Sequence, residues 1–172
     1  MHIEFLSGLE HPDEIGELFR EYTDMLVAGD PVFASYLKLQ SFDEELRHLE
    51  SKYAPPRGCL YLLRVDGRDA GCGGMKRLDE SRCELKRMYI RPPFRRMGLG
   101  RALALRIITD AREAGYEKML LDTLPFLRHA QELYRSLGFY EIERYNDSPM
   151  KGASYLCLDL CAAKEAQKDA EY

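Results

Sequence analysis

The chain has 172 residues, and its hydrophobic content of 45% and charged content of 31% are typical of a folded globular protein. This length predicts one domain that buries its core without disulfides or a structural metal. The net charge of −4 argues against a general nucleic-acid binder. The five cysteines lack metal-ligand spacing and are expected to be free thiols in a reducing compartment. Because no apolar stretch approaches the ~20 residues that cross a bilayer, we expect a cytoplasmic protein without membrane partners.

The first sixty residues are expected to form a strand followed by helices. Alternating residues at 2–6 predict the strand. Apolar residues at helical spacing after Pro12 predict a helix that ends at the breaker 29–31. Capping-box spacing after Ser41 predicts a further helix through about Lys52.

The rest of the chain alternates between strands and helices. Further strands are predicted at 59–65, 70–78, 84–90, 118–122, 139–145 and 154–160, and further helices at 101–114 and 126–137. A helix joins the strand that ends at Ile90 to the strand that begins at Lys118, so these two strands should be parallel. The expected fold class is therefore α/β with a mixed sheet. We expect a single domain over 1–161, followed by a polar tail at 162–172.

A basic turn with two glycines lies between the strand at 84–90 and the following helix. The first turn of a helix offers free N–H groups and a positive dipole end, which attract phosphate. Glycine leaves the backbone open to such a group, and Arg101 adds a cation beside it. Two glycines before a helix are also common as plain loop punctuation, so the motif alone is weak. The turn reads Arg95-Arg96-Met97-Gly98-Leu99-Gly100.

A second motif closes the helix at 126–137 and reads Leu133-Tyr134-Arg135-Ser136-Leu137-Gly138-Phe139. Strand, R-x-x-G-x-G turn, helix, strand and this second motif, in that order, resemble the GNAT superfamily of N-acetyltransferases. Motifs carry the resemblance over roughly residues 59–160, and element order alone extends it to the N-terminal helices. It implies a strongly twisted mixed sheet of about six to seven strands, flanked by about four helices. It also implies acetyl-CoA as co-substrate, bound where two parallel strands splay apart.

The resemblance assigns cofactor contacts to two segments. The turn from Arg95 to Gly100, with Arg101, would wrap the pyrophosphate. The backbone of Met88, Tyr89 and Ile90 would pair with the pantetheine arm like an added strand, and an N–H there could stabilise an oxyanion. Many members carry an asparagine seven residues before the acid tyrosine. Here that position is Leu127, so this contact is absent or replaced.

Tyr134 matches the general acid of the family, which would protonate the departing thiolate. The alternative is a packing role beside Leu133 and Leu137. Either role is compatible with its place on an amphipathic helix.

Glu84 is the candidate general base. It stands fourteen residues before Gly98, as the catalytic glutamate does in histone-type members. Strand alternation predicts one face that carries Glu84, Lys86, Met88 and Ile90. An ordinary ion-paired strand residue is the alternative, with Asp122 and Asp159 as weaker candidates for the base.

The sequence therefore predicts an acetyl-CoA-dependent N-acetyltransferase that acts on a small primary amine by direct transfer in a ternary complex. Residues 30–41 and 146–152 are expected to shape the acceptor pocket, where Lys151 or Arg57 could pair with an acceptor carboxylate. Acetylation of protein lysines or N-termini is the enzymatic alternative, and a non-catalytic acyl-CoA sensor is the alternative of another class. The oligomeric state stays open, and a homodimer is compatible with the sequence.

Overall fold

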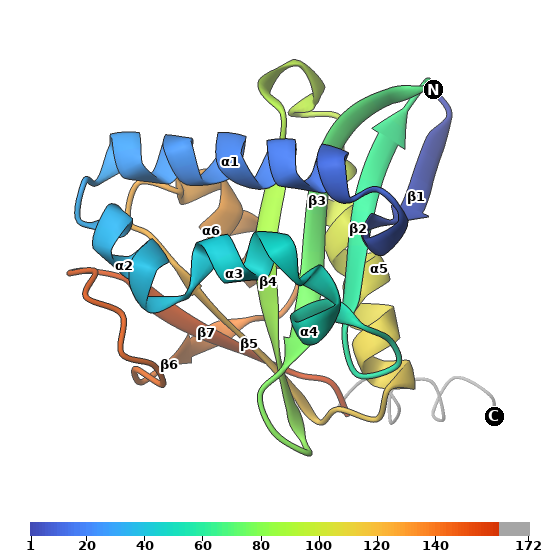
Figure 1. Ribbon diagram of the computed structural model, residues 1–172. Coiled ribbons are helices and arrows are strands. Elements are labelled where there is room, and N and C mark those ends of the chain that lie inside the picture. Colours follow the sequence, from blue (N-terminus) through green and yellow to red (C-terminus); the bar gives the residue numbers. More distant parts are fainter. Residues whose placement is uncertain (162–172) are drawn as a thin grey trace, which may run out of the picture.

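Figure 1 shows the computed structural model of the chain, in which residues 1–161 are described and the predicted tail lies outside the description. Within this range, seven strands form one sheet in the order β1-β2-β3-β4-β5-β7-β6, together with six α-helices. The strands are β1 Ile3–Ser7, β2 Cys59–Val65, β3 Arg68–Arg77, β4 Arg82–Ile90, β5 Lys118–Thr123, β6 Tyr140–Ile142 and β7 Ser154–Asp159. The helices are α1 Pro12–Gly29, α2 Phe33–Leu39, α3 Phe42–Arg47, α4 Leu49–Tyr53, α5 Leu99–Glu113 and α6 Arg128–Ser136. The predicted mixed α/β class is confirmed.

The central strands β4 and β5 are parallel, as predicted, while the other neighbours in the sheet are antiparallel. Helix α5 makes the crossover between them. Their pairing ends where Glu84 of β4 meets Leu120 of β5. Beyond that pair the two strands diverge, as Figure 1 shows. The sheet is therefore open on one side of its centre.

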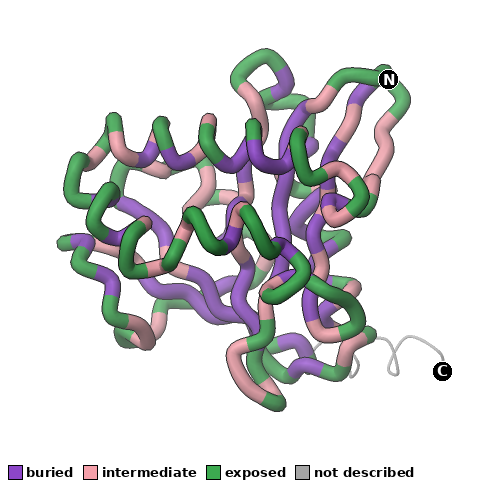
Figure 2. The backbone as a smooth tube through the Cα atoms, in the orientation of Figure 1, coloured by how far each residue is buried: buried purple, intermediate pink, exposed green. Residues whose placement is uncertain are grey.

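Helices cover both faces of the sheet, with α1 to α4 on one and α5 and α6 on the other (Figure 1). The core under α5 and α6 contains Leu103, Ile107, Met119, Leu121 and Leu156. The core under α1 and α4 contains Ile15, Leu18, Phe19, Tyr53 and Leu62. Figure 2 shows buried residues along the strands and on the side of α1 that faces the sheet. No helix within 1–161 has both the length and the apolar character that a bilayer crossing requires.

The predicted continuous helix through Lys52 is wrong. The chain forms α3 and α4 instead, with His48 between them outside helical geometry. Ser41 has φ +55 and makes no side-chain cap. In one straight helix, residues 45 and 53 would lie about 12 Å apart along the axis. The break brings their side chains together, because the Tyr53 hydroxyl donates a hydrogen bond to Glu45.

Helix α2 was not predicted, since it lies in a segment that we expected only as an acceptor loop. It ends at Leu39, two residues before Ser41. Phe33 and Tyr36 on its inner side are buried with Leu26 and Met150. Packing against these residues stabilises a helix that would be too short to form alone.

Strand β4 contains a bulge at Arg87, which has φ +58. Lys86 pairs with Gly74 of β3 and Tyr89 pairs with Cys72, so two residues of β4 stand opposite one residue of β3. The strand thereby carries one extra residue at its middle.

The bulge overturns the predicted common face of Glu84, Lys86, Met88 and Ile90. Met88 and Ile90 pack against the core under α5. Glu84 and Lys86 alternate with residues of that same core and so face the side of α1 to α4. An extra residue exchanges the two faces of a strand beyond the point of insertion, and the sequence carries no glycine or proline that announces it.

Candidate active site

The turn before α5 leaves the first N–H groups of the helix open. Gly98 is the N-cap residue with φ +76, and no side chain within 1–161 caps the helix. A Cβ atom at Gly98 would meet no atom of the described residues within 4 Å, and residues 95–98 are exposed. In the described part of the chain, side chains therefore do not fill the space that a phosphate group would need at this helix start.

Three arginines surround this turn. Nε of Arg95 donates to the carbonyl of Ile90 at 3.0 Å, and Nη1 of Arg101 donates to Oγ of Ser136 at 3.1 Å. Arg96 is exposed and makes no hydrogen bond to any residue in 1–161. Two of the cations are thus anchored beside the turn, and the third is free to meet a ligand.

The opening between β4 and β5 exposes backbone. Past Glu84, the edge of β4 that faces β5 has no strand partner among the residues described. This edge includes the bulge and Met88–Ile90. An unpaired strand edge can hydrogen-bond an extended ligand as an additional strand would.

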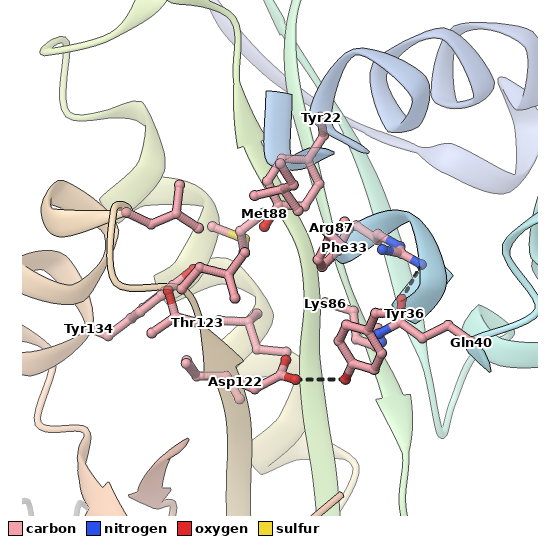
Figure 3. A pocket seen from close by; sticks show the side chains of 15 residues that line it. Tyr22, Phe33, Tyr36, Gln40, Lys86, Arg87, Met88, Asp122, Thr123 and Tyr134 are labelled. Atoms are coloured by element: carbon pink, nitrogen blue, oxygen red, sulfur yellow. Dashed lines mark hydrogen bonds between the residues drawn. The ribbon is translucent and has the colours of Figure 1, made fainter. Parts of the chain in front are cut away.

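A pocket lies where the two strands part (Figure 3). Its walls include β4 from Leu85 to Met88 and the chain from Leu121 to Leu124, together with side chains of α1, α2 and α6. It holds about 550 Å³ of empty space, part of which is open solvent. The charged residues on its walls are Lys86, Arg87 and Asp122. The pocket thus combines apolar side chains with polar and charged groups, as small-molecule sites do.

Two wall residues carry buried polar atoms without a hydrogen-bond partner in the described part of the chain. They are Nε of Arg87 and Oγ1 of Thr123. Buried polar atoms in folded proteins usually have a partner, so these two atoms are available to a polar ligand that reaches them.

Tyr134 lies on the pocket wall and comes from α6. The centre of its ring lies 5.7 Å from the centre of the Phe139 ring. Its hydroxyl makes no hydrogen bond within 1–161. Burial raises the pKa of this phenol above its usual value, so it stays protonated at neutral pH. That is the state that a general acid requires.

Glu84 lies beside the pocket but not on its wall. Its Oε2 accepts a hydrogen bond of 2.6 Å from the Tyr145 hydroxyl. Its Oε1 lies 3.5 Å from Nζ of Lys86 and 3.8 Å from Nζ of Lys76. The carboxylate is thus buried with partners on both oxygens, and Lys86 is its link to the pocket.

Asp122 lies directly on the wall. Its Oδ2 accepts hydrogen bonds from the Tyr36 hydroxyl at 2.7 Å and from Nδ2 of Asn146 at 3.0 Å; Figure 3 shows the first of them. The donors come from the two segments predicted to shape the acceptor pocket. Asp122 is a weaker candidate from the sequence, because no local signal shows that α2 and the 146–152 loop converge on it.

Arg87 ties the bulge to α3. Its Nη2 donates to Oε2 of Glu45 at 2.6 Å and to Oε1 of Gln40 at 3.1 Å. The guanidinium also lies over the rings of Phe19 and Phe42, at 5.8 and 5.1 Å from their centres. Although burial opposes its charge, Glu45 raises the pKa of Arg87, which stays a cation.

Comparison with known proteins decides the family. The model of the acetyltransferase (GNAT) family matches residues 17–139. The chain belongs to the GNAT family. It is therefore an acyltransferase that takes its acetyl group from acetyl-CoA, as the motifs predicted.

Curated relatives include other N-acetyltransferases. An uncharacterised N-acetyltransferase of Schizosaccharomyces pombe is 36% identical over 130 residues, which cover 74% of this chain and 80% of that protein. The N-acetylaspartate synthetase of Danio rerio is 30% identical over 123 residues, which cover 70% of this chain but 43% of that protein.

Solved GNAT structures share the fold. An acetyltransferase from Streptococcus agalactiae superposes with a TM-score of 0.74 at 19% identity, over 91% of this chain and 98% of that one. The N-acetyltransferase PseH of Campylobacter jejuni, solved in complex with acetyl coenzyme A, has a TM-score of 0.61 at 18% identity, over 92% and 99% of the two chains. This GNAT chain thus has the sheet and helix arrangement of those enzymes.

Leu127 replaces the asparagine that many GNAT members carry, and it lies on the pocket wall. The side chain of Gln131 reaches back from α6 and donates to the carbonyl of Leu124 at 2.8 Å. His129 of α6 points into solvent with 92% of its side chain exposed.

Proposed function

We propose that this GNAT acetyltransferase acetylates the primary amine of a small molecule by direct transfer from acetyl-CoA in a ternary complex. The observation that carries the proposal is the pocket at the parting of β4 and β5. Side chains from α1, α2, β4, β5 and α6 wall it. A concave pocket with walls from several elements suits a small acceptor better than a protein surface. The name of the zebrafish relative, an N-acetylaspartate synthetase, also points to acetylated small amines.

Two parts of the chain would hold the acetyl donor. The turn from Arg95 to Gly100, with Arg101, would bind the pyrophosphate through N–H groups and cations. The free edge of Met88–Ile90 would align the pantetheine arm. An N–H of this edge, fixed by the bulge, would donate to the thioester oxygen as negative charge develops on it.

Tyr134 would act as the general acid. The amine attacks the thioester carbonyl, the C–S bond breaks, and the departing thiolate takes a proton from the phenol. The unbonded hydroxyl on the pocket wall supports this role.

Two carboxylates compete for the role of general base, which removes a proton from the acceptor ammonium. Glu84 is the residue predicted from the sequence, but Tyr145 and two lysines already occupy it. Asp122 lies on the wall, and only its Oδ2 is engaged by hydrogen bonds within 1–161. This geometry favours Asp122 for the role, with Glu84 as the alternative.

Release of free coenzyme A tests the proposal. The protein is incubated with acetyl-CoA and either small primary amines or peptides with free N-termini and lysines. Turnover with small amines, and little with peptides, is expected. Preferred turnover of peptides would support protein acetylation instead, and acetyl-CoA binding without turnover of either class would support the non-catalytic sensor.

A further inference from the structure

The two strands that form the pocket present opposite charges to it. Glu84 of β4 and Leu120 of β5 form the last pair of the parallel ladder. Two residues further along each strand stand Lys86 on β4 and Asp122 on β5. Both side chains therefore leave the same face of the sheet, one on each side of the opening. Within residues 1–161, no ion pair shorter than 4 Å joins them.

The β4 side of the pocket holds more positive than negative charge. Glu84 has two lysines within 4 Å, Lys76 and Lys86. Glu45 likewise has two cations, with Arg87 at 2.6 Å and Lys52 at 3.8 Å. Among the residues described, four cations thus share two carboxylates, and Asp122 lies on the opposite strand.

Lys86 is the cation of this group that combines burial with a place on the pocket wall and weak pairing. Its side chain is 9% exposed, and its contact to Glu84 is 3.5 Å. Burial lowers the pKa of its ammonium, although the charge of Glu84 opposes this effect. A buried ammonium whose ion-pair partner lies 3.5 Å away is only partly compensated for the cost of its burial. A ligand carboxylate at the wall would lower that cost.

The lowered pKa of Lys52 is consistent with the same surplus of positive charge. Burial lowers its pKa to about 8, and Lys86, Lys76 and Arg87 add to the effect against the attraction of Glu45. The cations of β4 therefore lower the pKa of a lysine in α4.

From this arrangement we infer that the acceptor carries a carboxylate as well as its primary amine. The ammonium of Lys86 binds the carboxylate, and Asp122 receives the amine end before transfer. The substrate class is thus an amino acid or a similar aminocarboxylic acid. The inference rests on the proposed function and specifies its acceptor.

The two cations considered from sequence do not serve this role. Arg57 donates to the carboxylate and carbonyl of Glu80 and to the carbonyl of Ala114. Lys151 is exposed. Neither is on the pocket wall.

Matched acceptors test the inference. Release of coenzyme A is measured with L-amino acids and with their α-amides, and with glutamate against glutamine. At least one carboxylate-bearing member should exceed its amide in kcat/KM by about tenfold or more, which corresponds to about 1.4 kcal/mol. Equal or higher kcat/KM for every amide would overturn the inference and leave the proposed function standing.

Variants locate the contact. Lys86→Gln should raise KM for the preferred acid by about tenfold, erase its advantage over the amide, and leave the Kd of acetyl-CoA unchanged. Lys86→Arg keeps the charge and should retain the preference. Lys76→Gln is the matched control, because Lys76 approaches the same Glu84 oxygen but is not on the wall.

The outcomes distinguish failure of the assigned Lys86 contact from failure of the proposed function. A preference for acids that survives in a folded Lys86→Gln variant would overturn the assigned contact. If Lys86→Gln does not fold, loss of the preference in Lys86→Arg would overturn it too. Acetyl-CoA binding without acetylation of any amine would overturn the proposed function itself.

Discussion

The guanidinium of Arg87 donates a 2.6 Å hydrogen bond to the carboxylate of Glu45, and the two side chains are 3% and 0% exposed. Burial by itself would raise the pKa of Glu45, but the charge of Arg87 holds it below its usual value. The backbone of Arg87 is left-handed, a conformation that costs on the order of 1–3 kcal/mol for a non-glycine residue. The ion pair helps to hold the residue in that conformation and fixes the bulge against α3.

Replacing Glu45 should destabilise the fold strongly. Glu45→Gln removes the carboxylate that faces Arg87 and Lys52, and leaves a buried cation uncompensated. The free energy of unfolding should fall by about 3–5 kcal/mol, measured by urea denaturation. The control Glu44→Gln affects a carboxylate that is 61% exposed. It should change the free energy of unfolding by about 0.5 kcal/mol or less. Similar values for the two variants would contradict a structural role of the buried pair.

Tyr134→Phe should lower kcat on the order of 10²-fold because the leaving thiolate loses its proton donor. The Kd of acetyl-CoA should stay unchanged, since the ring still packs beside Phe139. Tyr140→Phe serves as control, because its hydroxyl bonds Asp159 at the surface. An unchanged kcat at saturating substrates, with chemistry rate-limiting, would remove Tyr134 from the mechanism.

Gly98→Val should weaken acetyl-CoA binding. A branched side chain would occupy the open space in front of α5 that the pyrophosphate needs. It would also strain a residue at φ +76. Gly115→Val is the matched control, since Gly115 has φ +86 and open space but follows the opposite end of α5. Calorimetric titration with acetyl-CoA should show a raised Kd for Gly98→Val and an unchanged Kd for Gly115→Val. Equal Kd values for the two variants would refute the proposed pyrophosphate site at this turn.

Asp122→Asn and Glu84→Gln separate the two candidate bases. If Asp122 takes the proton, Asp122→Asn should lower kcat/KM by about 10²–10⁴-fold. Glu84→Gln should have the smaller effect on kcat/KM. The reverse pattern would assign the role to Glu84, as the sequence predicted.

Lys52 should make stability depend on pH. Its pKa is about 8 in the folded protein against an ordinary value of 10.5, so the unfolded chain binds more protons between these values. Unfolding free energy therefore rises with pH from about 8 to 10.5, by on the order of 1–3 kcal/mol. Comparison with Lys52→Met isolates this effect, because other groups titrate in both proteins. The wild-type value minus the variant value should rise across this range, and a constant difference would contradict the lowered pKa.

Sequence patterns predicted the sheet and its crossover because these depend on local periodicity and chain direction. The strand before Arg95, the open glycine turn and the helix after it are neighbours in sequence, so their residues carry the whole signal. The Leu133–Phe139 motif likewise placed Tyr134 correctly on α6. In the structure this tyrosine lies on the pocket wall.

Contacts between distant residues could not be read in the same way. Tyr36 and Asp122 are 86 residues apart, and Arg87 and Glu45 are 42 apart. The bulge that turns Met88 away from the face of Glu84 needs no special residue type, so strand alternation predicted the wrong face.

The chain by itself thus determined the fold class, the open glycine turn at the start of α5 and the position of Tyr134 on α6, because each follows from residues close together in sequence. Tertiary structure alone decided which charges face the pocket. Lys86 and Asp122 reach its wall from two different strands, and Asp122 meets Tyr36 and Asn146 only when strand, helix and loop pack together. Charge pairing in a buried site depends on distances through space, and sequence spacing does not record them.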